Sequence, residues 1–176
     1  MGLLSIFQSK DPAKVAGQLA REALTMDITP EEAQWIEKLG VELARFIAER
    51  NALRVGMTEA GVFRVTGDSP RASSPAYKLM LALSAEFEQY FASMPGVEPS
   101  EGRAMYHRFS RRYILRMPDE VAGIFHYNLL HPENWNNDED VRTPPSELPD
   151  DFVEFVRLLM RSPMKKALER AQEIDV

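Results

Sequence analysis

Cysteine is absent from all 176 residues of the sequence, which excludes disulfide bridges and thiol chemistry. A chain without disulfides fits a reducing compartment. No apolar run approaches the roughly 20 residues that a membrane-spanning helix needs. The segment from Met1 to Phe7 lacks the basic start and the small-residue cleavage site of a secretory signal. We therefore expect a cytoplasmic protein that does not enter a membrane.

The sequence has fewer basic than acidic residues, with 21 lysines and arginines against 27 aspartates and glutamates. The resulting net charge of −6 argues against a protein coated in basic surface for nucleic acid. Motifs of several enzyme classes are missing as well, since no GxSxG elbow, GxxxxGKS/T phosphate loop or HExxH zinc motif occurs. We expect no cofactor, and binding without catalysis is the leading class of function.

The sequence does hold a series of prolines placed where helices begin. Proline suits the first helical position because its missing N–H is not needed there, and a preceding Asp, Ser or Thr can cap the helix. This pair occurs at Asp11-Pro12, Thr29-Pro30, Ser74-Pro75 and Ser162-Pro163. Pro118 and Pro149 are each followed by an acidic pair that suits a helix N-terminus. The pattern predicts an all-α bundle of six or seven helices.

Helical periodicity occupies most of the chain between these starts. We expect helices over about 11–26, 29–52, 75–93, 100–117, 118–130, 150–161 and from 163 nearly to the C-terminus. The helix from Thr29 is the best defined, because Thr29 and Glu32 form a capping box and Trp35 lies on its apolar stripe. Glycines interrupt the region around residues 55–66, where we expect a short β or irregular element. The chain is read as a single helical domain, 1–176, with a flexible leader (1–10) and a long acidic loop (131–148).

The expected helix over 100–117 concentrates positive charge. Residues 100–116 contain five arginines against one glutamate, whereas residues 117–154 contain ten acids against one arginine. The basic face of the helix carries Arg103, His107, Arg108, Arg111 and Arg112, and the opposite face is apolar. This face can pair with the acidic stretch of the same chain, bind a partner protein, or grip the phosphates of a nucleic acid.

The acidic loop over 131–148 contains an isolated aromatic residue, Trp135. Loops of this length are usually either functional or disordered. Trp135 can fold back over a hydrophobic crevice, anchor a partner protein or stack on a small ligand. An EF-hand calcium site is disfavoured, because Glu139 stands where the turn needs glycine. His126 and His131 lack the spacing of a zinc site. We therefore predict no metal.

Residues 58–80 have a faint helix-turn-helix outline, in which Pro70 would begin a DNA-reading helix. Pro75 would fall inside that helix and break it. Arg71 and the next helix start could instead cradle a phosphate, but neither standard phosphate-loop spacing is present. A surface loop is the simpler interpretation of this segment.

Our leading hypothesis is a small helical protein that binds another protein, or a second copy of itself, in an adaptor, regulatory or immunity-type role. The predicted partner-binding residues are Trp135, Asp138, Glu139, Asp140, Arg108, Arg111 and Arg112. One alternative is a nucleic-acid-binding regulator that uses the helix over 100–117. A second is an enzyme with a site between that helix and the next, built from His107, His126 and acids of the loop.

Overall fold

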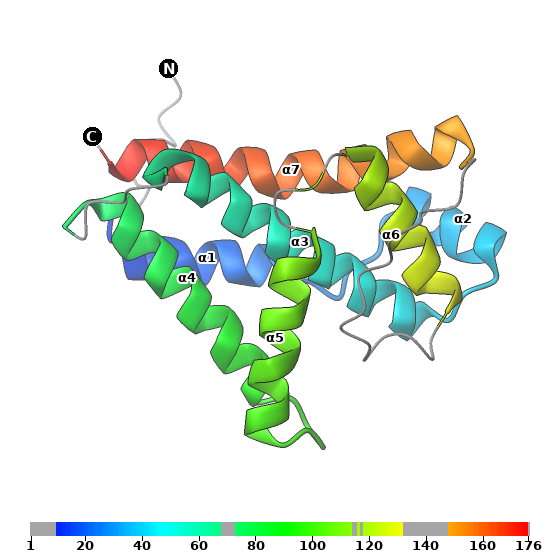
Figure 1. Ribbon diagram of the computed structural model, residues 1–176, viewed down its shortest axis with the longest axis horizontal. Coiled ribbons are helices and arrows are strands. Elements are labelled where there is room, and N and C mark those ends of the chain that lie inside the picture. The colour runs from blue at the N-terminus through cyan, green and yellow to red at the C-terminus, as the bar shows by residue number, and fades with distance from the viewer. Residues whose placement is uncertain (1–9, 68–72, 114–115, 117, 132–147, 176) are drawn as a thin grey trace.

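The fold is taken from a computed structural model that describes residues 10–67, 73–113, 116, 118–131 and 148–175. These ranges contain seven helices and no strand (Figure 1), so the predicted all-α class is confirmed. The helices are α1 (Pro12–Ala23), α2 (Pro30–Leu39), α3 (Leu43–Thr66), α4 (Pro75–Ala92), α5 (Pro99–Tyr113), α6 (Pro118–Leu130) and α7 (Asp150–Ile174). Most of the expected leader and of the acidic loop lies outside the described residues.

Three of the predicted proline starts are confirmed by their capping hydrogen bonds. The Asp11 carboxylate accepts from the Ala13 N–H at 3.0 Å, and the Ser74 hydroxyl accepts from the Tyr77 N–H at 3.1 Å. Thr29 accepts from the Glu32 N–H at 3.2 Å while Glu32 accepts from the Thr29 N–H at 2.8 Å, which completes the capping box. Local sequence therefore determines where α1, α2 and α4 begin.

The predicted helix over 29–52 is in fact two helices. α2 ends at Gly40, whose φ of 65° lies in the left-handed region that glycine adopts without a steric penalty. The N–H of Gly40 bonds to the Glu37 carbonyl at 3.1 Å, and the N–H of Val41 bonds to the Ile36 carbonyl at 3.2 Å. These bonds close the last turn of α2, and the chain changes direction before α3 begins at Leu43.

The prediction of a β or irregular element over 55–66 was wrong, because these residues belong to α3. α3 contacts α1, α4, α5, α6 and α7 and runs through the middle of the molecule (Figure 1). Every residue from Glu49 to Val62 is buried except Arg54. A helix covered on all sides has no single apolar face, so its periodicity is hidden. The helix-turn-helix outline placed a helix start at Pro70, which lies outside the described residues; the next described helix, α4, begins only at Pro75 and is capped by Ser74.

α7 is one continuous helix, so the predicted start at Ser162-Pro163 was also wrong. Pro163 lies inside α7 and has no N–H to donate to the Leu159 carbonyl. A proline inside a helix destabilises it by about 3 kcal/mol. Met160 on one side and Ala167 on the other are both buried. Packing on both sides of the proline therefore holds the helix together, and Figure 1 shows α7 extending along the whole upper edge of the molecule.

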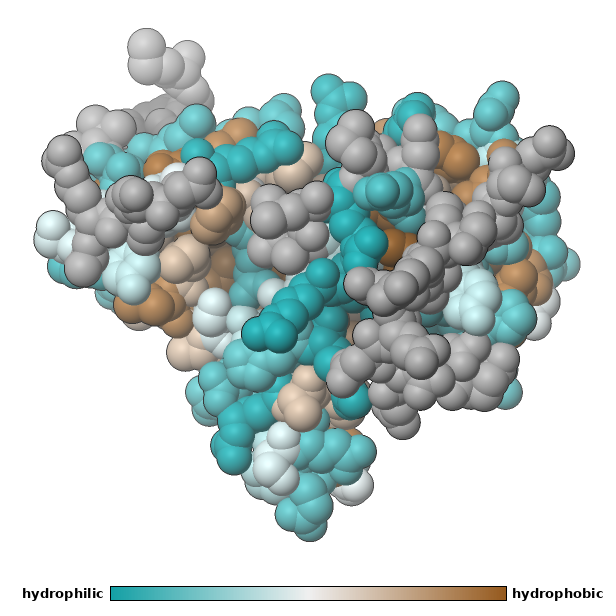
Figure 2. Space-filling model, in the orientation of Figure 1, coloured by the Kyte–Doolittle hydropathy of each residue, from teal (hydrophilic) through white to brown (hydrophobic). Residues whose placement is uncertain are grey.

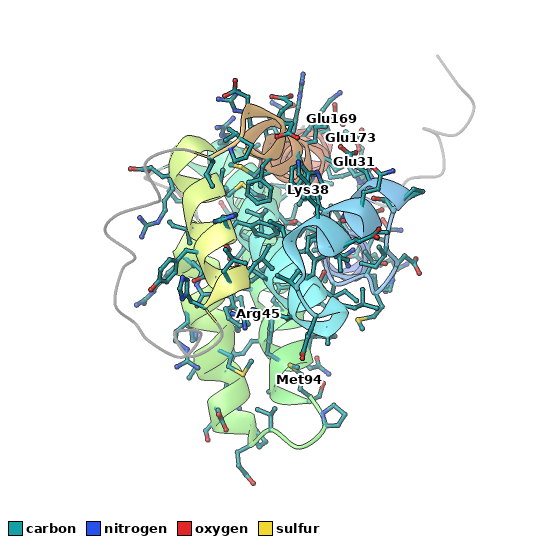
Figure 3. All side chains as sticks on the ribbon, turned by 90° about the vertical axis from the view of Figure 1, so that its right-hand side faces the viewer. Glu31, Lys38, Arg45, Met94, Glu169 and Glu173 are labelled. Atoms are coloured by element: carbon teal, nitrogen blue, oxygen red, sulfur yellow. The ribbon has the colours of Figure 1, made fainter. Side chains whose placement is uncertain are left out.

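An aromatic cluster joins α2, α3, α6 and α7. Trp35 is 8% exposed, which confirms its predicted burial. Its ring lies 5.0 Å from that of Phe152 and 5.5 Å from that of Phe155, measured between centroids. Lys38 closes the edge of the cluster, since its Nζ lies 4.1 Å from the Trp35 ring centre and 2.9 Å from an Asp151 carboxylate oxygen (Figure 3). The cluster fixes α2 against α7.

α3 and α7 approach each other closely at Gly61. A Cβ atom built at Gly61 would lie 2.4 Å from the Met164 carbonyl oxygen and 2.9 Å from the Ala167 Cβ. We predict that Gly61→Ala lowers the free energy of unfolding by about 1–3 kcal/mol, because the two helices must move apart. Urea unfolding measures this change.

Gly17→Ala on α1 is the matched control for that substitution. A Cβ at Gly17 would meet nothing closer than 3.5 Å, so alanine should stabilise the helix by about 0.5–1 kcal/mol. Equal changes in both variants would contradict the proposed close approach of α3 and α7.

Candidate functional site

The apolar face of α5 packs inward, as its sequence predicts. Tyr106, Phe109 and Tyr113 are all buried, and α5 packs against α3 and α4. Two of these side chains meet buried carboxylates of α3. The Tyr106 hydroxyl donates to Glu59 at 2.5 Å, and burial together with the Glu59 charge raises the pKa of Tyr106 above its usual range. α5 is thereby fixed to the central helix.

Arg112 belongs to this buried polar network. Its Nη1 lies 3.0 Å from a Glu49 carboxylate oxygen, with the Arg112 side chain 12% exposed and that of Glu49 fully buried. The same carboxylate accepts from the Tyr113 hydroxyl and from the Asn128 amide, the latter at 2.8 Å. The described acid partner of Arg112 is thus Glu49 of α3, which lies outside the acidic stretch 117–154.

The outer side of α5 carries three exposed basic residues, Arg103, His107 and Arg111, which we call the α5 stripe. Their spacing of four residues places them one above another on the helix. Arg103 Nε lies 3.8 Å from a Glu88 oxygen on α4, and both side chains are largely exposed. Among the described residues, none forms an ion pair with Arg111. Figure 2 shows hydrophilic residues gathered over α5, and Arg108 beside the stripe is half-buried.

The other predicted contact residues are Trp135, Asp138, Glu139 and Asp140, and all four lie outside the described part of the chain. Their role stays a prediction.

The two histidines of the enzyme alternative lie in different surroundings. His107 is exposed and its ring lies 4.9 Å from that of Tyr106 on the same helix. His126 is half-buried, with its ring 5.3 Å from that of Phe152 on α7. Burial and the neighbouring His131 lower the pKa of His126. In the described ranges no three His, Asp or Glu side chains gather as metal ligands would.

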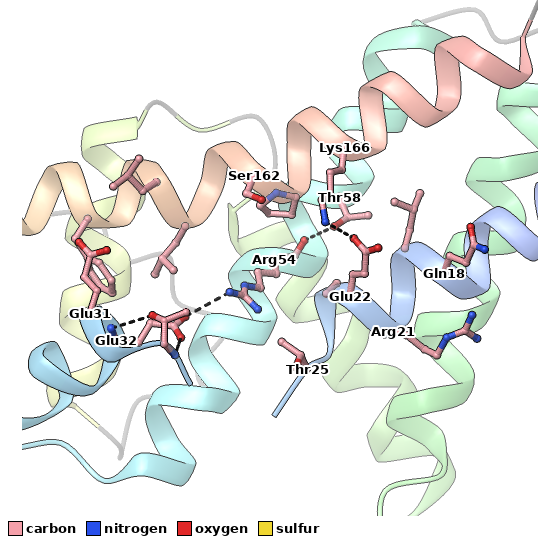
Figure 4. A pocket seen from close by; sticks show the side chains of 17 residues that line it. Gln18, Arg21, Glu22, Thr25, Glu31, Glu32, Arg54, Thr58, Ser162 and Lys166 are labelled. Atoms are coloured by element: carbon pink, nitrogen blue, oxygen red, sulfur yellow. Dashed lines mark hydrogen bonds and ion pairs between the residues drawn. The ribbon is translucent and has the colours of Figure 1, made fainter. Parts of the chain in front are cut away.

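The sequence analysis missed a cleft of about 630 Å³ between α1, α2, α3 and α7 (Figure 4). Its apolar walls include Leu19, Phe155, Leu158 and Leu159. Its charged lining residues are Arg21, Glu22, Glu31, Glu32, Arg54 and Lys166. The volume lies within the range of small-molecule sites.

A buried ion cluster forms one wall of this cleft. The Glu32 carboxylate lies 3.2 Å from Arg50 and 3.3 Å from Arg54, and the side chains of Glu32 and Arg50 are 1% and 0% exposed. Arg50 also donates to the Thr25 and Asp27 carbonyls, the latter at 2.6 Å. The sequence contains one indication of this cluster, the spacing of Arg50 and Arg54. Two arginines four residues apart on a helix repel each other, so their pairing predicts a nearby acid that contacts both.

Comparison with known proteins identifies no relative: no family model matches the chain, and neither a curated protein nor a solved structure is similar to it. Across the described helices, none is both long and apolar enough to cross a membrane.

Proposed function

We propose that this protein acts without catalysis by binding an acidic surface of a partner protein through the α5 stripe. The observation that carries the proposal is that the basic residues of α5 have different environments. Arg112 forms an ion pair with the buried Glu49, whereas Arg103, His107 and Arg111 are exposed on one side of the helix. Arginine is well suited to this role because its planar fork binds carboxylates with two parallel hydrogen bonds.

The described contacts of the stripe leave it available to a partner. The ion pair of Arg103 with Glu88 is long and exposed, and such pairs contribute only about 0–1 kcal/mol. A partner's carboxylate therefore has little to displace. Complementary charge would mainly accelerate the encounter and select the partner. We further propose that Trp135 and the acids 138–140 contact a basic region of the same partner. The partner would be met in the cytoplasm.

Nucleic acid is the second candidate, because the same stripe could contact phosphates. A stripe of two arginines and one histidine neutralises few phosphates, and the net charge of −6 opposes approach to a polyanion. The protein partner is therefore the better supported of the two.

The lack of cysteine provides a direct test of the proposal. We predict that a photo-crosslinker attached to the single thiol of Ala104→Cys captures a defined protein from native extract, because Ala104 is exposed on α5 one turn before His107 and the substitution keeps the whole stripe. The same reagent on Lys165→Cys, which is exposed on α7, should capture none. The measurement is mass spectrometry of the crosslinked product.

The captured protein must then bind purified chain in a way that depends on the stripe. Arg103→Ala with Arg111→Ala should weaken binding, whereas Lys14→Ala with Lys165→Ala, which removes the same charge elsewhere, should not. Equal weakening by both pairs would contradict the proposal. Tight binding of a short DNA duplex that falls steeply between about 50 and 200 mM salt would instead establish the nucleic-acid alternative.

A further inference from the structure

The cleft between α1, α2, α3 and α7 is independent of the α5 stripe and has a wall with excess positive charge. The buried cluster behind that wall contains two guanidinium groups, Arg50 and Arg54, and one carboxylate, Glu32. Three charged side chains with a net charge of +1 are costly to bury unless a further anion comes close.

Arg50 is fully occupied within the protein. Its side chain is 0% exposed and donates to the Glu32 carboxylate, to the Asn51 side chain and to the carbonyls of Thr25 and Asp27. Its charge is therefore enclosed and directed to internal acceptors. Arg54 is the member of the cluster that opens on the cleft.

Arg54 makes fewer hydrogen bonds than Arg50 among the described residues. Among the described residues its one hydrogen-bond acceptor is Glu32, at 3.3 Å, although a guanidinium has five N–H donors. The side chain is 18% exposed and lines the cleft (Figure 4). Burial and the nearby Arg50 charge lower the pKa of Arg54, and Glu32 only partly opposes them. The charged form of Arg54 would therefore gain from an additional anion.

The remaining charges around the cleft balance one another. Lys166 of α7 pairs with Glu22 of α1 at 2.9 Å, and both side chains are more than half exposed. Arg21 of α1 and Glu31 of α2 complete the rim with one charge of each sign. The excess positive charge thus lies at Arg54, and the two acids of the rim disfavour a doubly charged ligand.

The wall provided by α7 is apolar. Phe155 and Leu159 are buried, whereas Leu158 lines the cleft and remains 48% exposed. Leu19 of α1 adds a further apolar surface. A ligand that fits this cleft therefore combines an apolar body with one negative charge.

We propose that the cleft is a binding site for a small amphipathic monocarboxylate. The carboxylate bonds to N–H groups of Arg54 for which the described residues offer no acceptor, and the apolar part lies against Leu158 and Phe155. Arginine binds carboxylates and phosphates alike. The net charge of +1 and the acidic rim select the singly charged carboxylate.

Octanoate is a suitable probe, and the full chain can be titrated by NMR with the leucine methyl groups as reporters. We expect octanoate to shift the methyl resonances of Leu19 and Leu158, and 1-octanol to bind at least about tenfold more weakly because it offers Arg54 no charge. Octyl phosphate should bind more weakly than octanoate at neutral pH. Equal binding of octanoate and 1-octanol, or tighter binding of octyl phosphate, would overturn the proposal.

Two pairs of variants locate the site. Arg54→Met should weaken octanoate binding at least about tenfold, and Arg64→Met, an exposed position on the same helix, should not change it. Leu158→Ser should weaken octanoate binding severalfold, whereas Leu81→Ser, at a similarly exposed leucine of α4, should not. The Leu158 pair and the 1-octanol comparison remain decisive even if Arg54→Met fails to fold. Unchanged affinity in folded Arg54→Met, or resonance shifts confined to other regions, would show that the cleft is not the site.

Discussion

Arg50→Met is expected to lower the free energy of unfolding by about 3–5 kcal/mol, because it breaks a buried ion cluster from within. The substitution keeps most of the side-chain volume but removes the donors that satisfy the Thr25 and Asp27 carbonyls. It also leaves Glu32, only 1% exposed, with the single arginine contact to Arg54 at 3.3 Å. The loss is a large part of the 5–15 kcal/mol that is typical of natural domains. Urea unfolding followed by circular dichroism measures it.

Arg54→Met is the matched control, one helical turn away. It removes the same charge but leaves Glu32 paired with Arg50, and it relieves the repulsion between the two guanidinium groups. We expect a clearly smaller loss of stability than in Arg50→Met, because Glu32 keeps a buried arginine partner. Equal losses in the two variants would show that the cluster needs both arginines for stability, which would contradict the distinct roles assigned to them.

Trp35→Ala is expected to lower the free energy of unfolding by about 3–5 kcal/mol as well, through a different mechanism. The Trp35 ring contacts Phe152 edge-on and stacks on Phe155, so its loss opens a cavity between α2 and α7. α2 is short, and this ring is its main apolar contact with α7. The denaturant midpoint should fall accordingly.

Tyr90→Ala on α4 provides the comparison for an aromatic residue at the surface. Tyr90 is 38% exposed and its ring contact is with the adjacent Phe91. Its truncation should cost about 1 kcal/mol or less. An unchanged urea midpoint in Trp35→Ala would mean that the aromatic cluster does not hold α2 in place.

The helix starts could be predicted from sequence because capping is a local interaction. Asp11, Thr29 and Ser74 each bond to an N–H two or three residues ahead, so no distant residue is needed to determine the outcome. Ser162-Pro163 shows the limit of this reasoning. The same dipeptide lies inside α7, because buried residues on both sides of it favour a continuous helix despite the missing hydrogen bond.

The middle of α3 was misread because its environment is set by five other helices. Gly56 and Gly61 looked like breaks in the sequence, whereas both are buried in the central helix and Gly61 allows α7 to approach. Glu49 and Glu59 look like surface residues in the sequence, yet hydroxyl, amide and guanidinium groups of α5 and α6 satisfy Glu49. Glu59 is satisfied by hydroxyls of α4 and α5. The cleft was missed likewise, since its lining comes from segments that are distant in sequence.

The contacts of α3 also predict an order of assembly. The partners of Arg50 lie within residues 25–51, so that cluster can form while only the first third of the chain is available. The partners of Glu49 and Glu59 lie later in the chain. Glu49 bonds to Arg112, Tyr113 and Asn128, and Glu59 bonds to Ser84, Tyr106 and Ser110. In a chain that ends before α4, we therefore expect both carboxylates to stay in water, because none of the described groups that satisfy them is present. Two acids that are buried in the finished protein would then keep the unfinished α3 hydrated.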